Sequence, residues 1–87
     1  MNDATAGRET TVAILPFGPL TELSTEPLKL TVAFPLRAGE LRAELEQAYP
    51  ALREYRYRIA ADRRLLPEEA ELHGGEEIAL LPPFAGG

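Results

Sequence analysis

Two consecutive glycines, Gly86 and Gly87, end the sequence and leave a main-chain carboxylate with no side chain beside it. Glycine lets a backbone approach a ligand or a catalytic centre closely, because it has no Cβ. Chain ends are often frayed and without function. Here, however, the pair lies shortly after a strand-like apolar run, residues 78–81, and no Gly/Ser linker separates the two. We therefore predict that the carboxylate of Gly87 carries the chemistry of this protein.

The residues before Gly87 suit a tail that enters a narrow channel; they are Pro82, Pro83, Phe84, Ala85 and Gly86. Proline fixes φ and favours extended backbone, so a stiff tail loses less entropy when it enters a partner. Fully extended, the segment from Pro82 to Gly87 would span about 20 Å. We predict that residues 82–86 thread the channel and that the reaction takes place at Gly87.

The composition indicates one small folded domain and limits its chemistry. The chain has 87 residues, of which 45% are hydrophobic and 26% charged, as in ordinary globular domains. It has no cysteine and one histidine, His73, which excludes disulfides and a Cys/His zinc site. We expect no bound metal or cofactor. Any sulfur chemistry must use a group other than a side-chain thiol.

The charge and the hydrophobic pattern point away from nucleic acid and membranes. A net charge of −5 and a pI near 4.8 disfavour nucleic acid, whose phosphates need a basic surface. A basic patch on a partner protein is the more natural complement. No hydrophobic run approaches membrane-spanning length, and residues 1–11 lack the apolar core of a signal peptide. We expect a cytoplasmic protein.

The hydrophobic spacing predicts the elements that must position the tail. Alternation predicts strands at 12–17 and 29–34, and helical spacing predicts a helix from about Leu41 to Tyr49, which Pro50 ends. A strand at 56–60, a turn at Asp62–Arg63, a short strand at 64–66, a polar loop and a last strand at 77–81 follow. This ββαβ(β)β order predicts an α+β domain with one helix on a mixed sheet. We assign 1–10 to a flexible extension, 11–81 to the domain and 82–87 to the tail.

The first and last strands are apolar on both faces. Leu15 and Phe17 alternate with Ile14, and Leu81 alternates with Leu80. One short helix covers a single face of a sheet, so the other face presents apolar residues to a loop or to a partner. Because the tail that we predict to be reactive follows Leu81, we favour the interpretation that this face binds a partner.

Residues 74–87, which read GGEEIALLPPFAGG, resemble the C-terminal signature of the small subunit of molybdopterin synthase. The similarity extends from about Val12, and it implies a β-grasp, ubiquitin-like fold. Two positions depart from the family pattern: Glu76 replaces an aspartate, and Asp62 replaces an asparagine. We expect both changes to be harmless, since Asp and Asn are both turn formers.

The resemblance also implies a chemistry and a set of partners. An E1-like adenylyltransferase would adenylate the carboxylate of Gly87 with ATP, and a sulfurtransferase persulfide would supply sulfur for a thiocarboxylate. The large subunit of molybdopterin synthase, in an expected heterotetramer, would bind a cyclic pyranopterin and accept that sulfur. The chain would then bind no cofactor and would not itself be an enzyme, because the catalytic side chains would belong to the large subunit.

The β-grasp expectation also defines a partner-binding surface. In that fold the first and last strands are neighbours, so Phe17 and Leu81 would share the face away from the helix, with Leu65 at its rim. Other functions remain open: a sulfur carrier for thiamin or tRNA thiolation, a ubiquitin-like conjugation tag, or a non-covalent interaction domain with an inert tail. The Pro82–Pro83 pair favours the molybdopterin carrier.

Overall fold

The computed structural model of the chain describes residues 8–83. In that range the elements are, in chain order, β1 (Arg8–Pro16), η2 (Gly18–Glu22), β2 (Leu28–Phe34), β3 (Leu36–Arg37), α1 (Ala38–Ala48), η3 (Pro50–Glu54), β4 (Arg58–Ala61), β5 (Arg64–Leu65), β6 (Glu71–Leu72) and β7 (Ile78–Leu81). None of the helices within it is long and apolar enough to cross a bilayer.

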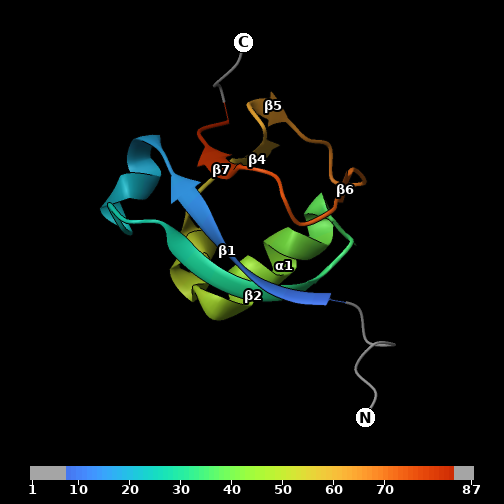
Figure 1. The fold of residues 1–87 in the computed structure, drawn as a ribbon. Helices are drawn as coiled ribbons and strands as arrows, with labels where there is room; N and C mark the ends of the chain where they lie inside the picture. The colour runs from blue at the N-terminus through green and yellow to red at the C-terminus, as the bar shows by residue number, and fades with distance from the viewer. Residues whose placement is uncertain (1–7, 84–87) are drawn as a thin grey trace.

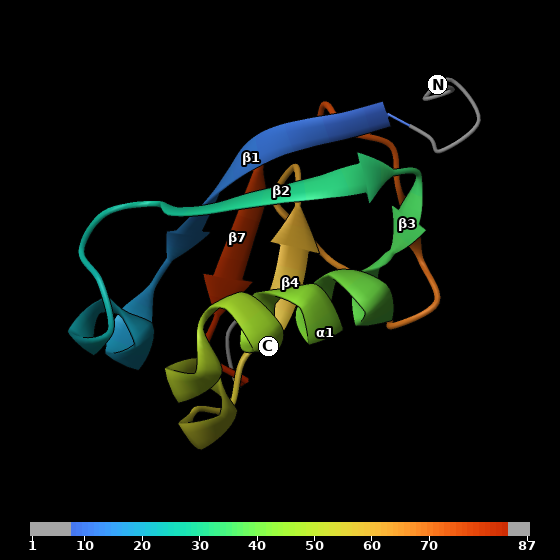
Figure 2. The same ribbon diagram turned by 90° about the horizontal axis from the view of Figure 1, so that it is seen from below.

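A mixed five-stranded sheet forms the centre of the molecule, in the order β2-β1-β7-β4-β5 (Figure 1). β1 and β7 run parallel, and the other neighbouring pairs are antiparallel. α1 lies across one face of this sheet (Figure 2). The α+β, β-grasp fold predicted from the sequence is therefore confirmed, with the first and last strands side by side.

β1 is longer than the hydrophobic pattern predicted. It begins at Arg8, not at about Val12, because residues 8–10 pair with residues 32–34 of β2. The last three residues of the segment that we assigned to a flexible extension therefore belong to the sheet. The hydroxyls of Thr11 and Thr31 lie 2.6 Å apart across this pair of strands. Backbone pairing needs no apolar side chains, so alternation alone missed this part of the strand.

The start of α1 is held by carbonyl groups from a distant loop. Its N-cap residue, Arg37, makes no side-chain capping hydrogen bond. Instead the N–H of Ala38 donates to Ala70 O at 2.8 Å, and the N–H of Gly39 donates to Glu68 O at 2.9 Å. Glu40 accepts a hydrogen bond from the N–H of Arg37 at 2.8 Å. These contacts satisfy N–H groups that a helix start leaves open.

The same loop adds a small second sheet that the sequence did not predict. β3 and β6 pair antiparallel, with Leu36 opposite Leu72 and Arg37 opposite Glu71. Two-residue strands have too few positions to show an alternation, so they become visible only through their pairing. Leu72 is buried here, while Leu36 packs partly against the core.

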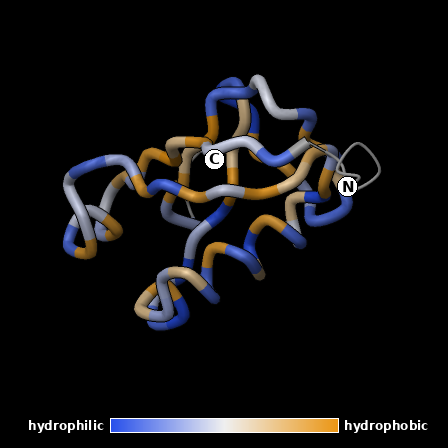
Figure 3. Tube along the Cα trace, turned by 60° about the horizontal axis from the view of Figure 1, so that its bottom comes forward, coloured by the Kyte–Doolittle hydropathy of each residue, from blue (hydrophilic) through white to orange (hydrophobic). Residues whose placement is uncertain are grey.

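The core lies between α1 and the inner face of the sheet. It is built from alternate strand residues and from one face of the helix, and Figure 3 shows hydrophobic positions recurring along these elements. Its fully buried large side chains are Ile14, Leu20, Leu41, Leu45, Leu52, Ile59, Leu72, Ile78 and Leu80. In each strand, the side chains that point inward thus stabilise the core. The alternate side chains point to the opposite face of the sheet.

Tyr57 closes the core beside the helix. Its hydroxyl donates to Glu46 at 2.7 Å, and the Arg42 guanidinium lies 4.5 Å from the ring centroid, which suits a cation–π contact. Burial, and then the hydrogen bond to the Glu46 carboxylate, raise the pKa of Tyr57 well above its ordinary value. Tyr57 is therefore a neutral donor in a structural contact and is not suited to proton transfer near neutral pH.

Candidate functional site

A row of small and apolar residues crosses four strands on the face away from α1. Leu15 of β1 is opposite Ala79 of β7, Ala79 is opposite Ala60 of β4, and Ala60 is opposite Leu65 of β5. Residues directly opposite in a ladder point to the same side of the sheet. The small alanines form the floor of this row, and Leu15 and Leu65, both half-buried, form its two ends.

Phe17 and Leu81 extend this surface to the ends of β1 and β7. Both line a groove of about 420 Å³ together with Leu15 and Ala79. Phe17 is 45% exposed and is the one large hydrophobic residue classed as exposed within the described part of the chain. A large aromatic side chain that remains in water beside an apolar groove is typical of an interaction surface. We call the surface formed by Leu15, Phe17, Leu65, Ala79 and Leu81 the apolar patch.

The residues predicted for partner binding therefore lie on one face. Phe17 and Leu81 share the groove, and Leu65 reaches the same face through Ala60. The prediction named neither Leu15 nor Ala79 as a contact residue. The signal that could have added them was already present, because both belong to the outward-facing set of strands that are apolar on both faces.

Charged residues border the apolar patch on the β4–β5 side. Arg58 is opposite Leu81, and Arg63 and Glu77 line the groove. Within residues 8–83, neither arginine forms an ion pair. The chain is acidic overall, but this rim carries two positive charges beside one negative charge. Net charge alone did not predict that local excess.

Two turns hold β7 in place. Asp62 and Arg63 both have positive φ, 51° and 69°, as a two-residue hairpin turn requires. Asp62 also bonds the residue before β7, since its Oδ1 accepts from the N–H of Glu77 at 2.9 Å and its own N–H donates to Glu77 O at 2.9 Å. Aspartate therefore both forms the turn and links it to β7.

Glu76 stabilises the second turn. Its carboxylate accepts hydrogen bonds from the N–H groups of His73, Gly74 and Gly75, at 2.7 to 3.1 Å. Partial burial alone would raise the pKa of Glu76, but these donors outweigh it and lower that pKa below its ordinary value. The glutamate side chain, which is longer than the aspartate of the family pattern, thus makes its hydrogen bonds within the turn.

The tail starts at the end of β7, next to Phe17. Pro82 is half-buried and Pro83 is exposed. The other residues predicted to act in the tail, Phe84 to Gly87, lie outside the described residues.

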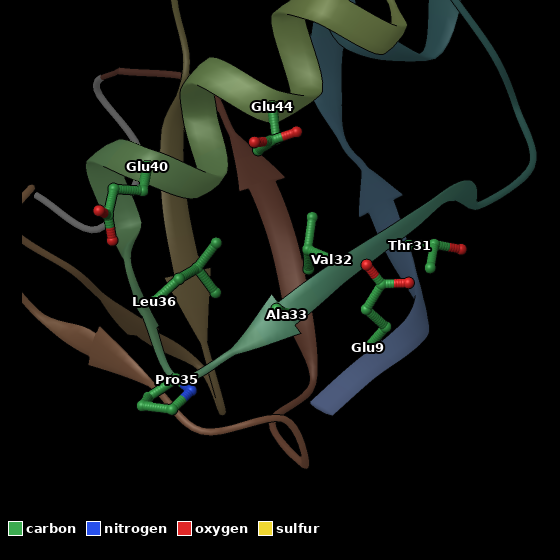
Figure 4. Close-up of a pocket in the computed structure, with 8 residues that line it drawn as sticks. All are labelled: Glu9, Thr31, Val32, Ala33, Pro35, Leu36, Glu40 and Glu44. Carbon is green, nitrogen blue, oxygen red and sulfur yellow. The ribbon is translucent and has the colours of Figure 1, made fainter. Parts of the chain in front are cut away.

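A second groove lies on the opposite side of β1, between the edge strand β2 and α1 (Figure 4). It also measures about 420 Å³, and its lining includes three carboxylates. We call it the acidic groove; its lining residues are Glu9, Thr31, Val32, Ala33, Pro35, Leu36, Glu40 and Glu44. Over the described range, no three acidic or imidazole side chains converge closely enough to hold a metal ion.

Comparison with known proteins agrees with this fold and with the C-terminal motif. Residues 14–87 match the ThiS family. The molybdopterin synthase sulfur carrier subunit of Mycobacterium tuberculosis is 32% identical over 80 residues, which cover 87% of this chain and 96% of that protein. The crystal structure of SAMP1 from Haloferax volcanii superposes with a TM-score of 0.70 and 21% identity, over 90% of this chain and 100% of that one. The chain belongs to the ThiS family.

Proposed function

We propose that the chain is a sulfur carrier, the small subunit of a molybdopterin synthase, which delivers sulfur from a thiocarboxylate at Gly87. The observation that carries this proposal is the place where the tail starts. Pro82 directly follows Leu81, one of the two strand-end residues of the apolar patch. A partner that docks on the patch therefore receives the tail at a fixed place. The similarity to a molybdopterin synthase sulfur carrier subunit supports the choice of acceptor.

The chemistry begins with activation of a poor acylating group. Adenylation joins the Gly87 carboxylate to the α-phosphorus of ATP and releases pyrophosphate. The terminal sulfur of a persulfide, held by a sulfurtransferase, then attacks the acyl carbon, and AMP leaves. A second thiol cleaves the S–S bond, is itself oxidised to a disulfide, and frees the thiocarboxylate.

Transfer uses the tail as a tether. The thiocarboxylate sulfur attacks a carbon of a cyclic pyranopterin held by the large subunit and displaces an oxygen substituent, so a C–S bond forms there as a C–O bond breaks. Attack of water on the acyl carbon then breaks the acyl C–S bond, which leaves the sulfur on the pterin and restores the Gly87 carboxylate. Tethering raises the effective concentration of the sulfur and orients it. In this mechanism no side chain of the carrier acts as acid or base, ATP is used by the activating enzyme, and the carrier binds no cofactor.

The partners follow from these steps. They are an E1-like adenylyltransferase, a sulfurtransferase and the large subunit, with which we expect a heterotetramer. We propose that the adenylyltransferase and the large subunit dock on the apolar patch in turn. Phe17 and Leu81 would be the central contacts, with Leu65 at the rim. Residues Pro82 to Gly86 would then thread into the active site of each partner.

The test is the intact mass of the chain isolated from its own cells. A sulfur-for-oxygen replacement at the terminus is expected, and a variant with one residue added after Gly87 should lack it. Sulfur accepted at the normal rate by the extended variant would contradict the tail mechanism. An immunoblot with a ladder of protein adducts would instead favour a conjugation tag.

A further inference from the structure

The parallel alignment of β1 and β7 continues beyond the ends of both strands. Pro16 is opposite Leu80, and the N–H of Phe17 donates to Leu80 O at 3.0 Å. Gly18, the residue after Phe17, then lies against Pro82. The first residue of the tail is thus in contact with the turn that follows β1.

This contact leaves no room for a side chain at residue 18. An ideal Cβ built on Gly18 would lie 2.6 Å from Pro82 Cγ and 3.3 Å from Pro82 Cδ. Real Cβ atoms essentially never approach a neighbour to 2.6 Å, so either the turn or the proline ring would have to move. Gly18 also has φ +62°, a conformation that glycine adopts readily.

We propose that Gly18 is a positioning residue, a seat for the Pro82 ring that sets where the tail starts and in which direction it leaves the sheet. The inference rests on the proposed sulfur-carrier function and adds a residue to it. Because the ring of Pro82 fixes its own φ, holding that ring against Gly18 fixes the direction of the chain at this point. The five residues after Pro82 can span about 18 Å at most.

The contact between Gly18 and Pro82 also connects the apolar patch, where a partner would dock, to the start of the tail. Phe17 and Leu81, the strand-end residues of the apolar patch, immediately precede Gly18 and Pro82. A partner that binds the patch therefore meets the start of the tail at a constant distance and angle. A tail that pivoted at this point would reach the same active site less often, because correct orientation of the reacting group would be lost.

Gly18→Asn tests the seat without changing the docking residues. Asparagine tolerates the left-handed backbone better than other side chains, so the variant keeps the turn while its Cβ displaces the ring of Pro82. With the activating enzyme, ATP, a sulfurtransferase persulfide and a thiol reductant, kcat for thiocarboxylate formation should fall about ten- to a hundredfold. The KM for the carrier should stay within about threefold of the wild-type value, because docking is intact. Gly75→Ala is the matched control, since a Cβ there meets nothing within 4 Å.

A double variant separates positioning from general damage. Pro82→Ala removes Cγ and Cδ, the two atoms closest to the new side chain, and leaves Cβ, at 3.9 Å, in ordinary contact. We expect Gly18→Asn/Pro82→Ala to have about the same kcat as Pro82→Ala alone, which is the non-additivity of a direct contact. Unchanged kcat in Gly18→Asn, or losses that simply multiply in the double variant, would overturn the inference. If the wild-type chain were not activated at all, the proposed function would fail instead.

Discussion

The apolar patch and the acidic groove border the same strand, β1, and their grooves have the same volume, about 420 Å³. Their linings differ. The patch contains the exposed Phe17 and the half-buried Leu81, which directly precedes Pro82, whereas the acidic groove carries Glu9, Glu40 and Glu44 between a sheet edge and α1. Size therefore does not distinguish a docking surface here. What distinguishes the surface that we propose for docking is apolar exposure combined with continuity to the tail that we propose to be reactive.

The largest expected effect lies at the end of the tail. Gly86→Val adds a β-branched side chain beside the reacting carboxyl group, so the tail should no longer fit the channel. Sulfur transfer should fall about a hundredfold or more, while the affinity for the large subunit stays unchanged because the patch is intact. The measurements are single-turnover transfer and titration calorimetry. Equal losses of transfer and affinity would mean that the tail itself, and not the patch, provides the binding energy.

The next effect compares two adjacent leucines on opposite faces of β7. Leu81→Ala, like Phe17→Ala, should weaken binding to the large subunit about tenfold, or about 1.4 kcal/mol, with little change in melting temperature. Leu80 is fully buried, so Leu80→Ala should instead destabilise the fold by about 2–5 kcal/mol. Calorimetry and thermal melts on the three variants make the comparison. A collapse in the stability of Leu81→Ala would place that residue in the core, and unchanged affinity would remove it from the interface.

A smaller effect concerns the charged rim of the patch. Arg58 lies opposite Leu81, so a docked partner would face it with an acidic group, although the net charge of the chain favours a basic partner. Arg58→Ala should weaken docking about threefold, mainly through a slower association rate and mainly at low salt. Glu44→Gln in the acidic groove is the control and should change neither rate nor affinity. A loss from Glu44→Gln as large as that from Arg58→Ala would contradict the distinction between the two grooves.

The smallest effect concerns Glu76, a carboxylate in neither groove. Its pKa is lowered in the folded state, so it stabilises the fold above its ordinary pKa, and that contribution disappears as the pH falls through the folded-state pKa. Glu76→Gln should therefore lower the melting temperature slightly at neutral pH, and the difference should vanish once the pH lies below the folded-state pKa. Glu44→Gln again serves as the control. A difference between wild type and Glu76→Gln that persisted at low pH would show that the amide itself disturbs the turn.

Much of the fold could be predicted because most elements carry their own signal. The helix has helical spacing and a terminating Pro50, and β7 and the second half of β1 have clear apolar runs. The same runs predicted a second apolar face, since the residues that point to either side of these strands are apolar. Such signals are local, so they need no knowledge of which segments meet.

What could not be predicted depends on contacts between distant segments. β3 and β6 exist only as a pair, and the start of β1 is defined by its partner in β2. Gly18 next to Pro19 is typical of any turn, and its contact with Pro82 becomes visible only when β1 and β7 lie side by side. The rim charge at Arg58 likewise requires the register of β4 on β7.

One edge of the five-stranded sheet, at β2, is protected against edge-to-edge pairing. β2 is an outer strand, and unpaired strand edges favour edge-to-edge aggregation. At Lys29 the hydroxyl of Tyr49 fills this edge, since it donates to Lys29 O at 2.8 Å and accepts from Lys29 N at 3.1 Å. Farther along β2, the carboxylates of the acidic groove stand beside the edge, so a second copy would bring like charges together. The surface that we propose for docking is thus combined with a β2 edge that resists pairing with a second copy of the chain.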